Sequence, residues 1–154
     1  RVECHGAVEL LRAEEERPIE YRRAVAAAGS GRLPRALQIA DALTVAEPYN
    51  GTYAELRADI LGLQADALPR GPERRALVEG ATRTYAELSA AMRGRQDEPW
   101  FRLTWKYVSR LSETDPDGAR RFFRLMEQRG YGAWDEGRWG WRAKMDDLRK
   151  VLTN

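Results

Sequence analysis

The sequence predicts an all-α fold. Alanine (22 residues) and leucine (16) far outnumber valine and isoleucine together (10), and unbranched side chains lose less rotamer freedom in a helix than β-branched ones. Apolar residues recur at spacings of three and four, the period of an amphipathic helix. Most of the seven prolines stand where helices begin or have just ended. With 154 residues, the chain is near the common size of one domain.

Prolines, glycines and capping residues divide the chain into eight expected helices. Short turns at 29–31, 67–71 and 94–98 separate several of them, so consecutive helices are expected to pack as antiparallel hairpins. The expected helices are Gly6–Glu16, Pro18–Gly29, Pro34–Glu47, Thr52–Leu68, Pro72–Met92, Pro99–Ser112, Pro116–Arg129 and Trp141–Leu152.

The first half of the chain is expected to bury stripes that are rich in small residues. Small side chains let two helix backbones approach closely. Asn50-Gly51-Thr52 also fits a glycosylation sequon but is better explained as the entry to a helix. The expected stripes are Tyr21, Ala24, Val25 and Ala28, then Leu33, Ala36, Leu37, Ala40 and Leu43, then Tyr53, Leu56, Ile60, Leu63 and Ala67.

The second half is expected to bury larger side chains. Asp115-Pro116 places an oxygen acceptor before a proline, which predicts a helix start, and Gly130 follows Arg129 where a helix ends. The expected stripes are Leu77, Ala81, Thr84, Leu88 and Ala91, then Trp100, Leu103, Thr104, Tyr107 and Leu111 facing Ala119, Phe122, Phe123 and Met126.

Composition excludes several classes of function. One cysteine and one histidine, Cys4 and His5, cannot close an internal disulfide or supply a zinc site. No stretch approaches the ~20 uncharged residues of a membrane span. The net charge of +2 is too small to select a partner by long-range attraction. We therefore expect no metal, no cofactor and no membrane partner. We also expect a cytoplasmic, bacterial protein. Because the sequence starts at Arg1, we expect it to be a fragment or a processed form.

Two approximate copies of a helical-hairpin pattern are present. Trp100-x2-Leu103-Thr104-x2-Tyr107 and Ala119-x3-Phe123 resemble the first and second helices of the tetratricopeptide repeat family, with Thr104 where the family has glycine. The segment from Gly31 through Ala36-Leu37 and Ala40 to Pro48 resembles the turn, second helix and terminal proline of another repeat. The resemblance implies one superhelical domain over 1–154, with hairpins near 18–47, 52–92 and 99–129 and a capping helix at 141–152.

The same resemblance implies a peptide-binding groove. In the family geometry the first helices line the concave face, so five residues would project towards it. Cationic side chains there would hold a peptide carboxylate, and aromatic ones would add apolar contact. Trp105 could equally belong to the core between helices. The expected groove residues are Tyr21, Arg22, Arg102, Trp105 and Lys106.

The main prediction is a non-catalytic scaffold that binds a protein or peptide. No nucleophile or acid–base pair stands out, because Glu14-Glu15-Glu16 and Asp146-Asp147 are consecutive and point apart on a helix. Two alternatives stay open. Residues 36–66 resemble the dimerisation segment of alkyl sulfatases, which implies an accessory region of a larger enzyme.

The second alternative is weak nucleic-acid binding through the basic C-terminal part. Residues 93–154 carry 14 basic and 10 acidic side chains. Trp134, Trp139 and Trp141 alternate with Arg138 and Arg142 and could stack on bases. A tryptophan-rich lid that seals the last hairpin is the favoured explanation, since the end of an array otherwise exposes apolar surface.

Overall fold

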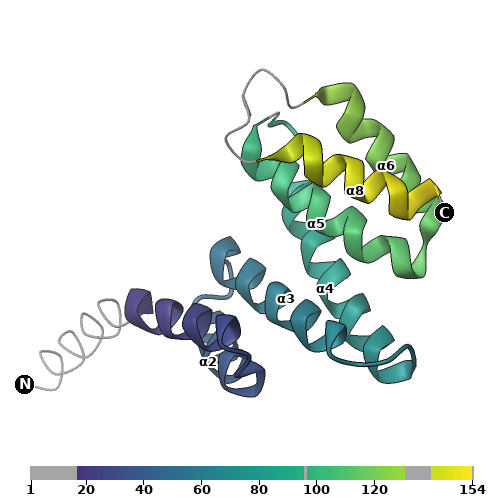
Figure 1. Cartoon of the computed structure of the whole chain (residues 1–154). Helices are drawn as coiled ribbons and strands as arrows, with labels where there is room; N and C mark the ends of the chain where they lie inside the picture. Colours follow the sequence, from purple (N-terminus) through teal and green to yellow (C-terminus); the bar gives the residue numbers. More distant parts are fainter. Residues whose placement is uncertain (1–16, 96, 131–139, 154) are drawn as a thin grey trace, which may run out of the picture. The chain divides into compact units, whose positions relative to one another are not determined.

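The computed structural model describes residues 17–95, 97–130 and 140–153 (Figure 1). These residues form seven helices and no strand, which confirms the all-α class. The helix expected at Gly6–Glu16 lies outside the described residues. Backbone contacts divide the chain into two compact units, 1–64 and 65–154. That all 154 residues form one repeat domain stays a prediction.

The first unit contains a helix at residues 17–29, helix α2 (Leu33–Ala46) and most of helix α3 (Gly51–Asp66). The turn before α2 uses Gly31 at φ +80°, a backbone conformation that favours glycine. The Tyr53 backbone N–H donates to Asn50 Oδ1 over 3.1 Å, so Asn50 caps α3 as expected. The core of this unit consists of Ala24, Ala27, Ala36, Ile39, Ala40, Leu43, Tyr53, Leu56 and Ile60.

The stripe predicted for α3 is partly wrong. Tyr53, Leu56 and Ile60 are buried as expected, whereas Leu63 is 42% exposed and Ala67 is exposed. The helix instead buries four further residues, Ala58, Leu61, Gly62 and Ala65. Because α3 is buried around most of its circumference, a single stripe does not describe it. In the helix at residues 17–29, Val25 is likewise exposed, and Ala27 is buried instead.

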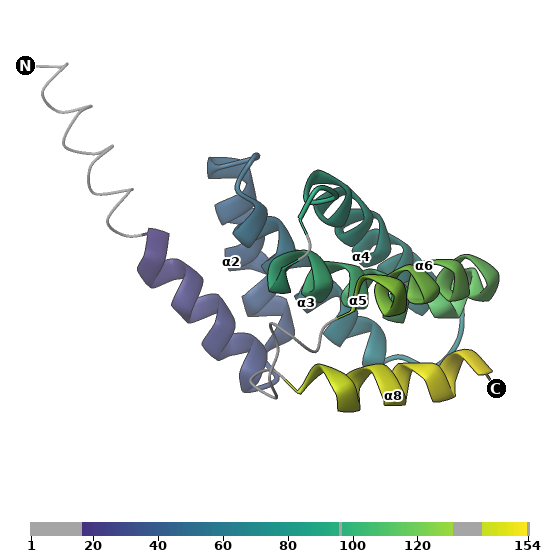
Figure 2. The same cartoon turned by 90° about the horizontal axis from the view of Figure 1, so that it is seen from above.

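The second unit is built around helix α5 (Glu98–Thr114). It contacts α4 (Pro72–Ala91), α6 (Pro116–Arg129) and α8 (Trp141–Thr153), and α8 also contacts α6 (Figures 1 and 2). The core is rich in aromatic residues and methionines, with Trp105, Tyr107 and Leu111 packed at its edge. Its buried members are Trp100, Phe101, Val108, Ala119, Phe123, Met126, Trp141, Met145, Leu148 and Leu152.

The buried face predicted for α4 is also partly wrong. The helix buries Val78, Ala81, Thr82 and Tyr85, and only Ala81 belonged to the expected stripe. The Thr82 hydroxyl donates to the Val78 carbonyl over 2.6 Å, so threonine is buried with its polar group satisfied. Of the other expected residues, Leu77, Thr84 and Leu88 are half-buried and Ala91 is exposed. A stripe placed by leucines therefore lies to one side of the true buried face.

The ends of α6 match the sequence prediction. The Gly118 backbone N–H donates to Asp115 Oδ1 over 3.0 Å, and Pro116 opens the helix. Gly130 follows the helix at φ +74°, where glycine is strongly favoured. Helix α5 continues to Thr114, and Asp115 directly links it to α6.

Helix α8 covers an apolar face of the α5–α6 pair. Trp141, Met145, Leu148 and Leu152 are buried along one side of the helix. The Trp141 ring meets the Phe101 ring edge-on at 4.9 Å between centroids. Helix α8 thus covers the α5–α6 pair of the second unit. Trp134 and Trp139 lie outside the described residues.

Candidate binding groove

The five groove residues predicted from sequence are divided between the two units. In the first unit, Tyr21 is half-buried, with its ring centroid 6.0 Å from that of Tyr53, while Arg22 is exposed. The other three lie on α5 of the second unit. A single groove formed by all five residues therefore stays a prediction.

The three residues on α5 have different surroundings. Arg102 forms an ion pair with Glu98 at 2.8 Å. Lys106 Nζ lies 6.0 Å from the centroid of the Tyr85 ring. Trp105 is half-buried and packs against the core, with its ring centroid 6.0 Å from that of Trp141. Trp105 thus contributes to packing, the alternative that the sequence left open.

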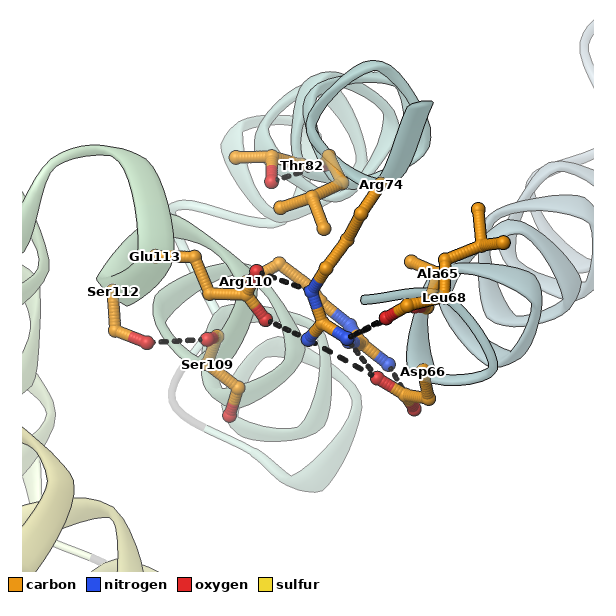
Figure 3. A network of polar contacts seen from close by, with 10 residues as sticks. Ala65, Asp66, Leu68, Arg74, Thr82, Ser109, Arg110, Ser112 and Glu113 are labelled. Carbon is orange, nitrogen blue, oxygen red and sulfur yellow. Dashed lines mark hydrogen bonds and ion pairs between the residues drawn. The ribbon is translucent and has the colours of Figure 1, made fainter. Parts of the chain in front are cut away.

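A network of ion pairs continues along the polar side of α5 (Figure 3). Arg110 Nη1 and Nη2 donate to the two carboxylate oxygens of Asp66 at 2.7 and 3.0 Å. Arg74 donates to both oxygens of Glu113, at 3.1 and 2.6 Å, and to the carbonyls of Ala65 and Leu68. Bidentate pairing of this kind fixes the orientation of the guanidinium and the carboxylate and also pairs their charges.

Charge pairing in this network shifts the protonation equilibria of its members. The hydrogen bonds from Arg110, followed in effect by its charge and that of Arg74, hold the pKa of the Asp66 carboxyl below its usual value despite partial burial. The bonds to Glu113 and Asp66 raise the pKa values of Arg74 and Arg110. The four side chains pair with one another, so the network is structural.

An apolar hollow with charged residues at one end lies between α4, α5 and α6. We call it the arginine groove. Its volume is about 300 Å³, near the lower limit for small-molecule pockets. Its lining residues come from the last two turns of α4 and the segment after it, from α5 and from α6. They are Ala86, Ser89, Ala90, Arg93, Trp100, Thr104, Tyr107, Phe122, Leu125 and Arg129.

One end of the arginine groove is built around Arg129. Its guanidinium carbon lies 4.3 Å from the centroid of the Trp100 ring, within cation–π range. Its Nη1 donates to the carbonyl of Arg93 at 3.1 Å and contacts that of Arg95 at 3.5 Å. The Arg93 side chain is exposed beside it. Two cationic side chains therefore lie at one end of an apolar floor.

Aromatic rings form the rest of the floor. The Tyr107 and Phe122 rings meet edge-on at 5.0 Å and 79°. Phe122 remains 38% exposed, so its ring faces the open side of the groove. Burial, and secondarily the charge of Asp115, raises the pKa of the Tyr107 phenol. The phenol is therefore neutral at physiological pH, and the groove offers apolar contact plus fixed positive charge.

This chemistry suits binding. The ionisable lining groups of the groove are Arg93, Arg129 and Tyr107, of which arginine does not exchange protons near neutral pH. Among the described residues, no group of three or more His, Cys, Asp or Glu side chains could hold a metal ion. Within the same residues, every helix is too short or too polar to cross a bilayer.

Sequence reasoning identified only part of this groove. It placed Tyr107 and Phe122 on facing stripes, and their rings do meet. It was wrong to expect Phe122 to be buried, since that side chain is 38% exposed. It did not select Arg93, Leu125 or Arg129 as binding residues. The available signal was weak, because Arg93 follows α4 whereas Leu125 and Arg129 lie on α6, and they acquire a common surface only after folding.

Comparison with protein-family models, with curated proteins and with solved structures found no match to this chain.

Proposed function

We propose that this chain is a non-catalytic helical module that binds a segment of another protein. The observation that supports this function best is the arginine groove, which combines an open aromatic floor with arginines at one end. Exposed aromatic and arginine side chains are over-represented among the residues that dominate protein interfaces. A half-exposed phenylalanine on a packed floor is a favourable anchor for such contact.

We also propose a tetratricopeptide-like hairpin for α5 and α6. Of the residues that supplied the resemblance, Trp100, Leu103, Thr104, Ala119 and Phe123 are buried and Tyr107 is half-buried. Thr104 takes the small-residue position, and its hydroxyl donates to the Trp100 carbonyl over 2.7 Å. Because the hydroxyl is satisfied internally, threonine substitutes for glycine there at little cost. These contacts support the hairpin, and the number of repeats is a proposal.

The function can be tested by site-specific photo-crosslinking in cells of the source organism. A photoreactive phenylalanine analogue would replace Phe122 in the arginine groove. The matched control is Tyr49, a fully exposed aromatic residue between α2 and α3. We expect a discrete protein adduct at position 122 and none at position 49. Absence of an adduct at 122, or the same adducts at both positions, would overturn the proposal.

A second photoreactive position separates the two candidate surfaces. Lys106 belongs to the set predicted from sequence and lies outside the lining of the arginine groove. An adduct at position 106 and none at 122 would assign binding to the polar side of α5. An adduct at 122 alone would assign it to the arginine groove. The adducted protein would then be purified and its affinity for the wild-type chain measured.

A further inference from the structure

The arginine groove continues onto the outer face of α6. A second, shallower hollow of about 470 Å³ is lined by Arg121, Phe122, Arg124, Leu125 and Gln128. Phe122 and Leu125 line both hollows. The two therefore form one surface, which we call the extended groove. It runs from the C-terminal end of α4 across α5 to the exposed side of α6.

Every charged side chain that lines the extended groove is an arginine. Arg93 and Arg129 lie at one end, and Arg121 and Arg124 lie along α6. No carboxylate belongs to the lining of either hollow. Because arginine stays protonated, this surface is positive at any physiological pH. An uncompensated positive strip beside apolar residues is complementary to a segment that is both acidic and apolar.

These arginines differ from several others in the second unit. Arg74, Arg95, Arg110, Arg120 and Arg149 each form an ion pair with a carboxylate of this unit. Within the part of the chain that the structure describes, the groove arginines form no such pair. Arg129 is held by backbone carbonyls and by the Trp100 ring instead. Arg83 is also exposed and has no ion pair among the described residues, but it lies outside both hollows. The extended groove is therefore distinguished by available positive charge beside apolar residues.

The spacing of the arginines favours a peptide over a small anion. Residues 121 and 129 are separated by eight helical steps of ~1.5 Å, or about 12 Å along the axis. A peptide spans that length with about eight residues in a helix or about four in an extended conformation. A single small anion would contact only one end of this row of arginines, whereas a short peptide reaches both the arginines and the aromatic floor.

The rings of the groove are poorly placed to stack on nucleic-acid bases. Base stacking requires an accessible ring face. Trp100 is only 4% exposed, and Arg129 lies over its ring. Tyr107 and Phe122 pack edge to face against each other. A single apolar side chain fits beside Phe122 better than a row of stacked bases, so the observations favour a protein over a nucleic acid.

We propose that the extended groove binds an acidic peptide segment that places one apolar side chain on Phe122 and Leu125 and its carboxylates on Arg93, Arg121 and Arg124. This inference rests on the proposed binding function and adds the chemistry of the partner. Partner choice then follows from the charge of the flanking residues, and affinity from the apolar anchor. The contacts between the peptide carboxylates and these arginines are solvent-exposed, so salt screens them.

The partner chemistry can be tested by selecting peptides on the full chain. A display library of random peptides of about 12 residues, enough for three helical turns, is panned against immobilised protein. We expect enrichment of Leu, Phe or Trp flanked by Asp and Glu. Panning against the Arg93→Gln/Arg121→Gln/Arg124→Gln variant should remove the acidic enrichment. Selection of peptides without an acidic bias, or failure to select any, would overturn the inference.

Binding of the selected peptide then gives a quantitative test by fluorescence anisotropy. Arg121→Gln/Arg124→Gln should weaken binding about 3- to 10-fold, in line with two exposed charge pairs. Phe122→Ala should weaken it about 10-fold or more through loss of the anchor. Arg83→Gln, an exposed arginine of α4 outside both hollows, is the matched control and should bind as the wild type. Circular dichroism confirms that each variant is folded.

Two further probes separate the possible failures. The selected peptide with Asn and Gln in place of Asp and Glu should bind at least fivefold more weakly, and the difference should shrink at high salt. Equal affinity would overturn the acidic-partner inference but leave protein binding intact. A single-stranded oligonucleotide that binds more tightly than the peptide, and is lost in Arg121→Gln/Arg124→Gln, would overturn both in favour of nucleic acid.

Discussion

The guanidinium of Arg129 lies over the indole ring of Trp100, with 4.3 Å between the guanidinium carbon and the ring centroid. The contact joins the last turn of α6 to the first turn of α5. Because Arg129 also donates to the Arg93 carbonyl at 3.1 Å, it ties the segment after α4 to the same point. This one side chain therefore holds together the end of the arginine groove.

Replacement of Arg129 is expected to lower the free energy of unfolding. Arg129→Ala loses the cation–π contact and a hydrogen bond to the backbone, together worth about 1–2 kcal/mol. Arg129→Lys keeps the charge but loses the planar stacking on Trp100, so its free energy of unfolding should lie between those of the wild type and Arg129→Ala. Arg124→Ala on the same helix, which has no ion pair within the described residues, should change stability by less than ~0.5 kcal/mol. Urea unfolding measures all three, and an equal effect of Arg124→Ala would contradict this assignment.

Trp141 is expected to be among the most sensitive positions of the second unit. It is buried, contacts Phe101 edge-on and begins the helix that covers the α5–α6 pair. Trp141→Ala should lower the free energy of unfolding by about 3–5 kcal/mol, the range for large aromatic side chains in a core. Val151→Ala, 60% exposed on the same helix, should cost less than ~0.5 kcal/mol. Guanidinium chloride unfolding would reveal the contrast, and similar losses would argue that α8 packs differently.

Much of the fold could be predicted because its signals are local. Helix ends depend on residues close in sequence, such as Asp115 before Pro116 and glycine at position 130, and these were placed correctly. The buried faces depend on the neighbours that surround a helix. For α4 the stripe was placed on Leu77 and Leu88, but α5 is the main partner of that helix and the buried face contains Thr82 and Tyr85. Side-chain hydrophobicity alone does not contain this information.

The candidate site was less predictable than the fold. The arginine groove depends on Arg93 after α4 and on Phe122 and Arg129 of α6, which share a surface only after three helices pack. By contrast, a repeat motif is visible in the sequence because its packing positions recur at fixed spacing. Trp105 illustrates the ambiguity, since an aromatic residue on a first helix fits a groove and a core equally well until its contact with Trp141 is known.

The Asp66–Arg110 pair is expected to make stability depend on pH. Hydrogen bonds from Arg110 lower the pKa of Asp66 in the folded chain below its unfolded value of ~3.9. Its contribution is therefore fully present above that unfolded value and is lost as pH falls through the folded pKa. Because the side chain of Asp66 is about half exposed, the contribution is screened to about 0.5–1 kcal/mol.

Asp66→Asn provides the corresponding experiment. The wild-type chain should be more stable than the variant at pH 7. The difference should shrink as the pH falls below the unfolded pKa of ~3.9 and vanish below the folded pKa of Asp66. Urea unfolding at several pH values measures the difference directly. Asp117→Asn is a suitable control, since its carboxylate pairs with Arg120 at an exposed site on α6. A pH-independent difference between wild type and Asp66→Asn would contradict the charge-based explanation.

The start of α6 is expected to tolerate only side chains that can accept a hydrogen bond. Asp115 caps the helix through the Gly118 N–H, and a Cβ atom on Gly118 would collide with the Asp115 carboxylate. Asp115→Ala should therefore cost about 1 kcal/mol, whereas Asp115→Asn, which keeps an acceptor, should cost only a few tenths. Gly118→Ala should be destabilising although alanine is the better helix former, because it displaces the cap. The double variant Asp115→Ala/Gly118→Ala distinguishes this mechanism, since alanine at 118 costs less once the carboxylate is gone. Additive losses in thermal unfolding would show instead that the two residues act independently.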